Sequence, residues 1–232
     1  MQSGWQKIGE LNCIFKPGRP GGSCVILFHG YGADANDLYP LHEYLGLSKN
    51  VSWIFPQGPQ QVVLGPGMAG RAWFNIDIAI LEKAMMAGSY RDMSHSRPQG
   101  LDRIQKSALS MFNECKANFS NVVLGGFSQG AMLATQTALV AAEKPDALVV
   151  LSGTLLDKDN WKKQAKSCQG LPFFQSHGKN DALLDPKKAE ELFEMLSNAG
   201  LEGQFEIFRG GHEIPPSVLS ALGKFLRRLG IL

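Results

Sequence analysis

The sequence lacks the features that mark a membrane-spanning or a nucleic-acid-binding protein. It contains no run of about 18 apolar residues, the length that a bilayer-spanning helix needs. Its first residues, Met1 to Glu10, contain no apolar core of signal-peptide length. The net charge is only +2 and no block of like charge occurs, which gives nucleic-acid binding no support. We therefore expect a cytoplasmic protein without an integral membrane segment.

Cysteine and histidine are also scarce. The four cysteines are widely spaced and form no C-x-x-C pair, and the five histidines show no metal-ligand spacing. A metal site therefore finds no support in the sequence. Buried free thiols in a reducing compartment are expected at the four cysteine positions, which are Cys13, Cys24, Cys115 and Cys168.

The sequence does contain a regular alternation of strand-like apolar runs and helical patterns. Such alternation is typical of an α/β fold with a mostly parallel central sheet and helices on both faces. Strands are expected at Leu11–Phe15, Cys24–Phe28, Val51–Phe55, Val122–Gly126, Ala147–Leu151, Phe173–Ser176 and Gln204–Phe208. Helices are expected at Leu101–Cys115, Gln129–Glu143, Pro186–Ala199 and Pro216–Leu229. No linker breaks the chain, so we expect one domain over residues 1–232.

Two segments do not fit this alternation. Residues 56–71 are rich in Gly, Pro and Gln, yet they contain Val62, Val63, Leu64 and Met68. Residues 75–98 form a second, longer segment of mixed composition. Long irregular segments in a compact domain are often lids or binding loops, but a surface excursion that packs its apolar residues on the body is an equal alternative.

A pattern for a reactive serine lies between the predicted strand at Val122–Gly126 and the helix that follows. Residues 126–130 read Gly-Phe-Ser-Gln-Gly, which matches G-x-S-x-G in the context of strand, sharp turn and helix. Gly126 and Gly130 give the turn room and leave the Ser128 hydroxyl exposed above the sheet edge. We predict that Ser128 is a nucleophile; the alternative is an ordinary serine in a tight turn.

A nucleophilic serine needs a base and a group that orients the base. His212 follows the last predicted strand and the pair Gly210-Gly211, and we predict that it is the base. Asp181 follows the strand Phe173–Ser176, and we predict that it orients His212. Asp185 is a rival, but its position directly before Pro186 indicates a helix cap. His177 ends a strand and precedes Asp181, which favours a packed turn residue over the base.

The intermediate of such a reaction carries a negatively charged oxygen, which N–H donors directed at it must stabilise. One is expected from the residue after the nucleophile, Gln129, at the positive end of its helix. The second is expected from the loop after an earlier strand, where residues 29–32 read His-Gly-Tyr-Gly and Tyr31 N–H becomes the candidate. A plain turn is the alternative for this loop.

These motifs together resemble the phospholipase/carboxylesterase family of small serine esterases, which includes the acyl-protein thioesterases. The matching stretches run over residues 27–34, 55–59, 71–74, 125–130, 177–181 and 211–212 and cover most of the chain. The resemblance implies an α/β-hydrolase fold with Ser128, Asp181 and His212 as the triad. It also implies Tyr31 and Gln129 N–H groups as the oxyanion hole, and neither a metal nor an organic cofactor.

The resemblance also implies where the acyl chain binds. The loop after Pro56, with Val63 and Leu64, corresponds to the flexible loop that shapes the acyl pocket in the family, and Trp73 is expected to line that pocket. Some members of the family form dimers, so a homodimer is one possible state of this protein. The sequence departs from the family pattern at Ala131, Asn75 and Lys179, and residues 75–98 are longer than usual.

The expected function is therefore a serine carboxylic-ester hydrolase that works through an acyl-enzyme. Its substrate would be a small-molecule or lipid acyl ester or thioester, with an S-acylated protein among the candidates. An acyltransferase would use the same triad, and a hydrolase-fold binding protein without turnover is a third hypothesis. The order Ser128, Asp181, His212 argues against the third, because a pure binder does not need these three residues together.

Overall fold

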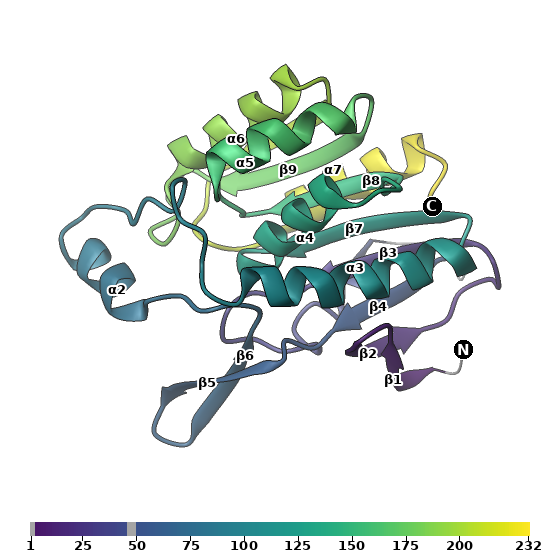
Figure 1. Ribbon diagram of the computed structural model, residues 1–232, viewed down its shortest axis with the longest axis horizontal. Helices are drawn as coiled ribbons and strands as arrows, with labels where there is room; N and C mark the ends of the chain where they lie inside the picture. Colours follow the sequence, from purple (N-terminus) through teal and green to yellow (C-terminus); the bar gives the residue numbers. More distant parts are fainter. Residues whose placement is uncertain (1–2, 46–49) are drawn as a thin grey trace.

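The centre of the molecule is an eight-stranded sheet, which the computed structural model describes within residues 3–45 and 50–232 (Figure 1). The sheet order is β1-β2-β4-β3-β7-β8-β9-β10. The strands are β1 (Gly4–Ile8), β2 (Leu11–Lys16), β3 (Ser23–Phe28), β4 (Ser52–Pro56), β7 (Asn121–Phe127), β8 (Ala147–Leu151), β9 (Pro172–Gly178) and β10 (Glu202–Phe208). The strands from β4 to β10 in this order pair in parallel, whereas β1 and β2 are antiparallel. The mostly parallel sheet expected from the sequence is confirmed.

Helices cover both faces of this sheet, as the sequence predicts. The helices are α1 (Leu41–Tyr44), α2 (Ile78–Met86), α3 (Leu101–Asn118), α4 (Gln129–Val140), α5 (Lys158–Ala165), α6 (Pro186–Asn198) and α7 (Pro216–Arg228). Apolar side chains of α3, α4, α5 and α6 pack in one core, and those of α1 and α7 pack in a second core. In Figure 1, α3 to α6 lie in front of the sheet and α7 lies behind it. No helix of the described residues is long and apolar enough to cross a bilayer.

The two irregular segments contain secondary structure that the sequence did not reveal. In the first segment, β5 (Gln60–Gly65) and β6 (Met68–Ala72) form an antiparallel hairpin that ends one residue beyond position 71. Within residues 75–98, the nine-residue helix α2 buries none of its side chains. Figure 1 shows both the hairpin and α2 projecting from the same side of the molecule.

The four cysteines are buried and free, as the sequence predicts. Burial raises the pKa of the Cys24 thiol well above its usual value, and the neighbouring Cys115 adds to the effect. Cys24 is therefore an unreactive core residue at neutral pH. Within residues 3–45 and 50–232, no group of three or more His, Cys, Asp and Glu side chains is arranged to hold a metal ion.

Candidate active site

The sharp turn predicted at residues 126–130, called the nucleophile elbow below, lies between β7 and α4 and is strained. Ser128 has φ of 55° and ψ of −118°, a conformation that costs a non-glycine residue roughly 1–3 kcal/mol. The two flanking glycines are a steric requirement. A Cβ on Gly130 would lie 2.1 Å from the carbonyl oxygen of Phe28, and a Cβ on Gly126 would lie 2.4 Å from the backbone of Gly130. The packing of β7, α4 and β3 therefore explains the Gly-x-Ser-x-Gly spacing.

The topology brings the other predicted residues to the same edge of the sheet. Asp181 follows β9 and His212 follows β10, and these strands run parallel to β7, so their carboxyl ends meet. A Cβ on Gly178 would lie 2.1 Å from the carbonyl oxygen of Gly211, which shows how closely the two loops approach.

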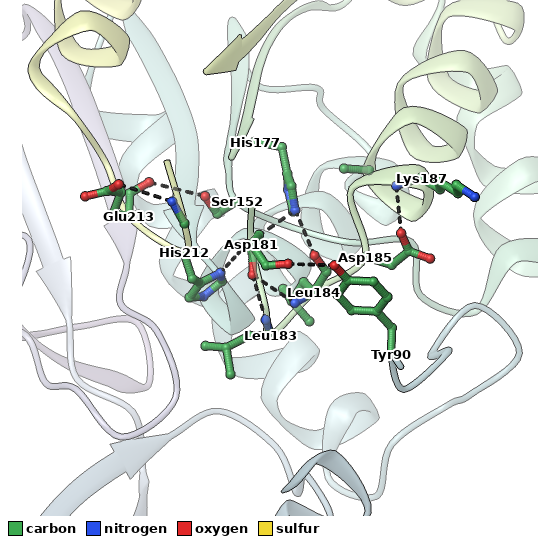
Figure 2. Close-up of polar contacts among 12 residues, drawn as sticks. Tyr90, Ser152, His177, Asp181, Leu183, Leu184, Asp185, Lys187, His212 and Glu213 are labelled. Atoms are coloured by element: carbon green, nitrogen blue, oxygen red, sulfur yellow. Dashed lines mark hydrogen bonds and ion pairs between the residues drawn. The ribbon is translucent and has the colours of Figure 1, made fainter. Parts of the chain in front are cut away.

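His212 and Asp181 form a direct hydrogen bond. The distance from His212 Nδ1 to Asp181 Oδ2 is 2.7 Å (Figure 2). The other carboxylate oxygen, Oδ1, accepts the backbone N–H groups of Leu183 at 2.9 Å and Leu184 at 3.0 Å. Burial alone would raise the pKa of Asp181. The pKa is nevertheless lowered overall, because His212 acts on the carboxylate through its hydrogen bond and its charge, and because the two N–H groups donate to it. Asp181 is thus held as a buried carboxylate against the imidazole.

Asp185, the rival acid, has the role that its sequence position predicts. It is the N-cap of α6, and its carboxylate accepts the backbone N–H of Lys187 at 3.0 Å. His177 lies within β9 and is buried. Figure 2 shows that Asp181, and not Asp185, faces the His212 ring.

The loop at residues 29–32 lies against the elbow. A Cβ on Gly30 would lie 3.5 Å from the Cβ of Ser128, so the backbone passes directly beside the predicted nucleophile. Among the hydrogen bonds of residues 3–45 and 50–232, none uses the Tyr31 N–H. The backbone N–H of Gln129 belongs to the first turn of α4, where such groups have no acceptor within the helix. The backbone beside Ser128 thus includes both residues predicted to supply donors, Tyr31 and Gln129.

The hairpin and a buried network hold this loop in place. Gly32 N–H donates to the carbonyl of Arg71 at 2.8 Å, and Arg71 N–H donates to the carbonyl of Ala33 at 2.9 Å. The Gln129 side chain accepts the Trp73 N–H at 2.9 Å and donates to the carbonyl of Phe74 at 2.7 Å. The segment after β6 is thereby fixed to the first turn of α4.

Trp73 lies beneath the site and not in the wall of the cavity. Its side chain is fully buried, its indole Nε1 donates to the carbonyl of His29 at 2.7 Å, and its ring lies 4.7 Å from the His29 ring between centroids. This differs from the expectation that Trp73 lines the acyl pocket. The reason is that the indole packs in the main core against Phe28 and His29, so it fills the space under the loop that begins at His29.

A cavity of about 570 Å³ opens beside Ser128 and His212. Val63 and Leu64 line it, as expected, and Tyr31 lies at its wall. Sequence reasoning missed the apolar residues that complete the lining, which are Ala33, Ile76, Ile78, Leu81, Met93, Phe127, Met132, Leu183 and Leu184. Asp37, Glu82 and Arg91 give it a polar portion. The methionines and isoleucines within residues 75–98 were the only signal that could have pointed to this wall.

Comparisons with known proteins show the family and the fold. The sequence profile of the Phospholipase/Carboxylesterase family matches residues 10–229. Acyl-protein thioesterase 1 of Cryptococcus neoformans is 29% identical over 178 residues, 74% of this chain and 71% of that protein. Acyl-protein thioesterase 1 of Candida albicans is 25% identical over 224 residues, 89% of this chain and 92% of that protein. The crystal structure of esterase PE8 superposes with a TM-score of 0.80 at 25% identity and covers 94% of this chain and 99% of its own. The chain therefore belongs to the phospholipase/carboxylesterase family of α/β-hydrolases, whose members are serine hydrolases of ester or thioester bonds.

Proposed function

We propose that this chain hydrolyses esters or thioesters through an acyl-enzyme formed on Ser128. The observation that carries the proposal is the 2.7 Å hydrogen bond from His212 to the buried Asp181, with His212 and Ser128 lining one cavity. This bond occupies His212 Nδ1 and leaves Nε2 as the nitrogen that accepts a proton. The three residues thus have the roles of nucleophile, base and orienting carboxylate.

In the first half of the reaction, the Ser128 hydroxyl oxygen attacks the acyl carbonyl carbon and its proton passes to His212 Nε2. The carbonyl oxygen becomes an oxyanion, which the N–H groups of Tyr31 and Gln129 stabilise. The intermediate then collapses, and the leaving alkoxide or thiolate takes the proton from His212. In the second half, a water oxygen attacks the acyl carbon while the water proton passes to His212. The bond between the acyl carbon and the Ser128 oxygen then breaks, the Ser128 oxygen takes the proton back from His212, and the carboxylic acid leaves.

The substrate class follows from the cavity and from the relatives. Most of the residues that line the cavity are apolar, including Val63 and Leu64 of the β5–β6 hairpin and two residues of α2, which suits an acyl chain. Relatives with the name acyl-protein thioesterase support S-acylated proteins as the substrate class, and the name of the phospholipase/carboxylesterase family supports lipid esters. Transfer of the acyl group to an acceptor other than water would use the same triad, and product analysis would reveal it as an acylated acceptor in place of free acid.

A covalent label tests this proposal. A fluorophosphonate should react with the wild type in a 1:1 ratio, and peptide mapping should place the adduct on Ser128. Ser107→Ala is the matched control, because Ser107 lies on α3 and outside the cavity, with its hydroxyl bonded to Glu10. The control should label fully and Ser128→Ala should not label. An adduct on another serine would contradict the proposal.

A further inference from the structure

A second histidine contacts the carboxylate that orients His212. His177 lies one residue before the end of β9 and is 1% exposed. Its Nε2 lies 3.3 Å from Asp181 Oδ2 and 3.1 Å from the carbonyl oxygen of Leu184. Figure 2 shows His177 on the opposite side of the Asp181 carboxylate from His212. The proposed mechanism gives this buried titratable group no role.

The partners of His177 decide which of its nitrogens carries the proton. A backbone carbonyl can only accept a hydrogen bond, so Nε2 must be protonated to bond Leu184. The same N–H also faces Asp181 Oδ2, at the longer distance of 3.3 Å. Ring nitrogens of two imidazoles, His177 and His212, thus lie within 3.3 Å of Oδ2, while Oδ1 accepts two backbone N–H groups.

His177 makes this contact as a neutral ring. Burial lowers its pKa below the usual value, against the opposing effects of the Leu184 carbonyl and the Asp181 carboxylate. The titratable groups that act on it are Asp181 and His212, and the positive form of His212 also disfavours a second charge. At neutral pH, His177 thus contributes a hydrogen-bond donor and no net charge.

We propose that His177 is a positioning residue, which fixes the Asp181 carboxylate and withdraws part of its negative charge from His212. The proposal rests on the proposed function, in which His212 is the base. A neutral donor on Oδ2 makes the carboxylate a weaker partner for the imidazolium form of His212. It also prevents the carboxylate from rotating about its Cβ–Cγ bond and leaving His212 unoriented.

Loss of the His177 N–H donor is expected to change both the pH dependence of kcat/KM and the value of kcat. With one donor fewer, Asp181 holds more charge and stabilises the imidazolium of His212 more strongly. The acidic limb of the kcat/KM profile should then move to higher pH by about 0.5 unit, the effect of one neutral hydrogen bond. A less fixed carboxylate should lower kcat roughly tenfold while KM stays nearly unchanged, because no substrate contact is lost.

The experiment compares His177→Leu with His177→Gln in the full chain. The Gln amide can reach the position of Nε2 and donate a hydrogen bond, whereas Leu fills similar space without a donor. His177→Leu should show the shifted limb and the lower kcat, and His177→Gln should restore both. If both variants melt at lower temperature but keep the wild-type limb, His177 is only a structural residue and the proposal is overturned.

Two further measurements keep the test decisive. Should His177→Leu fail to fold, nitrogen-15 NMR of the wild type reports the tautomer directly: the proposal requires a neutral His177 with its proton on Nε2 between about pH 6 and pH 8. A proton on Nδ1, or a charged ring in that range, overturns it. The Ser128→Ala variant separates the proposed function from the proposed role of His177. If Ser128→Ala is active, the proposed function is refuted. If Ser128 is needed but the acidic limb of His177→Leu is not shifted, only the role of His177 is refuted.

Discussion

The buried His29 should make the stability of the protein fall steeply as the pH is lowered. This residue begins the loop that passes beside Ser128, and its side chain is 1% exposed. Its Nδ1 bonds the carbonyl of Gly30 at 2.7 Å, and its Nε2 accepts the N–H of Gly58 at 3.0 Å. Only the neutral ring with its proton on Nδ1 satisfies both partners, because a protonated Nε2 would oppose the Gly58 N–H.

The magnitude follows from the shift in the pKa of His29. Burial lowers this pKa from 6.5 to about 4, although the Gly30 carbonyl and Asp34 oppose the shift. As the pH falls below 6.5, the unfolded chain takes up the proton and the folded protein does not. The stability that neutral His29 contributes is therefore complete above that pH and lost on acidification. A difference of about 2.5 units corresponds to about 3 kcal/mol in total, of which about 2 kcal/mol is lost by pH 5.

Urea unfolding of wild type and His29→Gln at about pH 7.5 and about pH 5 measures this effect. The Gln amide can still accept the Gly58 N–H but cannot titrate. His29→Gln should therefore lose about 2 kcal/mol less free energy of unfolding between the two pH values than the wild type does. Comparing the two proteins removes the contributions of the other titrating groups, including His177. An equal loss in both would refute the argument that buried His29 resists protonation.

Three further predictions concern turnover. The kcat/KM of the wild type should fall as the solution is acidified, since only neutral His212 can act as base, and a profile that stays flat on acidification would count against this assignment. Asp181→Asn should reduce kcat by roughly 10⁴-fold, because the amide would favour the wrong His212 tautomer. Asp185→Asn should only lower the free energy of unfolding in urea, by about 1 kcal/mol. If instead Asp185→Asn is inactive and Asp181→Asn is active, the acid is misassigned. Replacing Val63 and Leu64 by Ser should flatten the rise of kcat/KM with acyl chain length, worth up to about 0.8 kcal/mol per CH₂, and spare acetate esters. Equal loss on short and long esters would mean that the hairpin supports the site instead.

The inner strands could be predicted because they are buried on both faces. β8 (Ala147–Leu151) is an unbroken apolar run with the boundaries that the sequence predicts, and all its residues are buried. The edge strand β1 (Gly4–Ile8) was missed, because its exposed residues Trp5 and Lys7 alternate with the half-buried Gln6 and leave no apolar run. A strand that is buried on both faces has a continuous apolar sequence, which is easy to identify. A strand that is buried on one face has a weaker, alternating pattern.

The hairpin and α2 could not be predicted because local sequence does not determine them. The hairpin is fixed to the loop beside Ser128 through the backbone of Arg71, a contact between distant segments. The exposed fraction of the Val63 side chain is 82%, so the hydrophobic pattern of β5 points to no core. Helix α2 has no fully buried side chain, and its apolar residues Ile78 and Leu81 line the cavity instead of the core, so its pattern does not show how the segment packs.

The pairing of His212 with Asp181 could be predicted, because parallel strands deliver their following loops to one edge of the sheet. The place of Trp73 could not, because a motif does not reveal which way a side chain turns at the end of β6. The role proposed for His177 also depends on a contact that needs coordinates, the 3.3 Å approach to Asp181.

The most direct test of the central claim is the steady-state hydrolysis of a p-nitrophenyl ester by wild type and Ser128→Ala, with circular dichroism to show that both fold. The account predicts a loss of kcat of roughly 10⁴- to 10⁶-fold in the folded variant. A folded Ser128→Ala protein that retains more than a few per cent of the wild-type rate would contradict the account, since no acyl-enzyme could then form on Ser128.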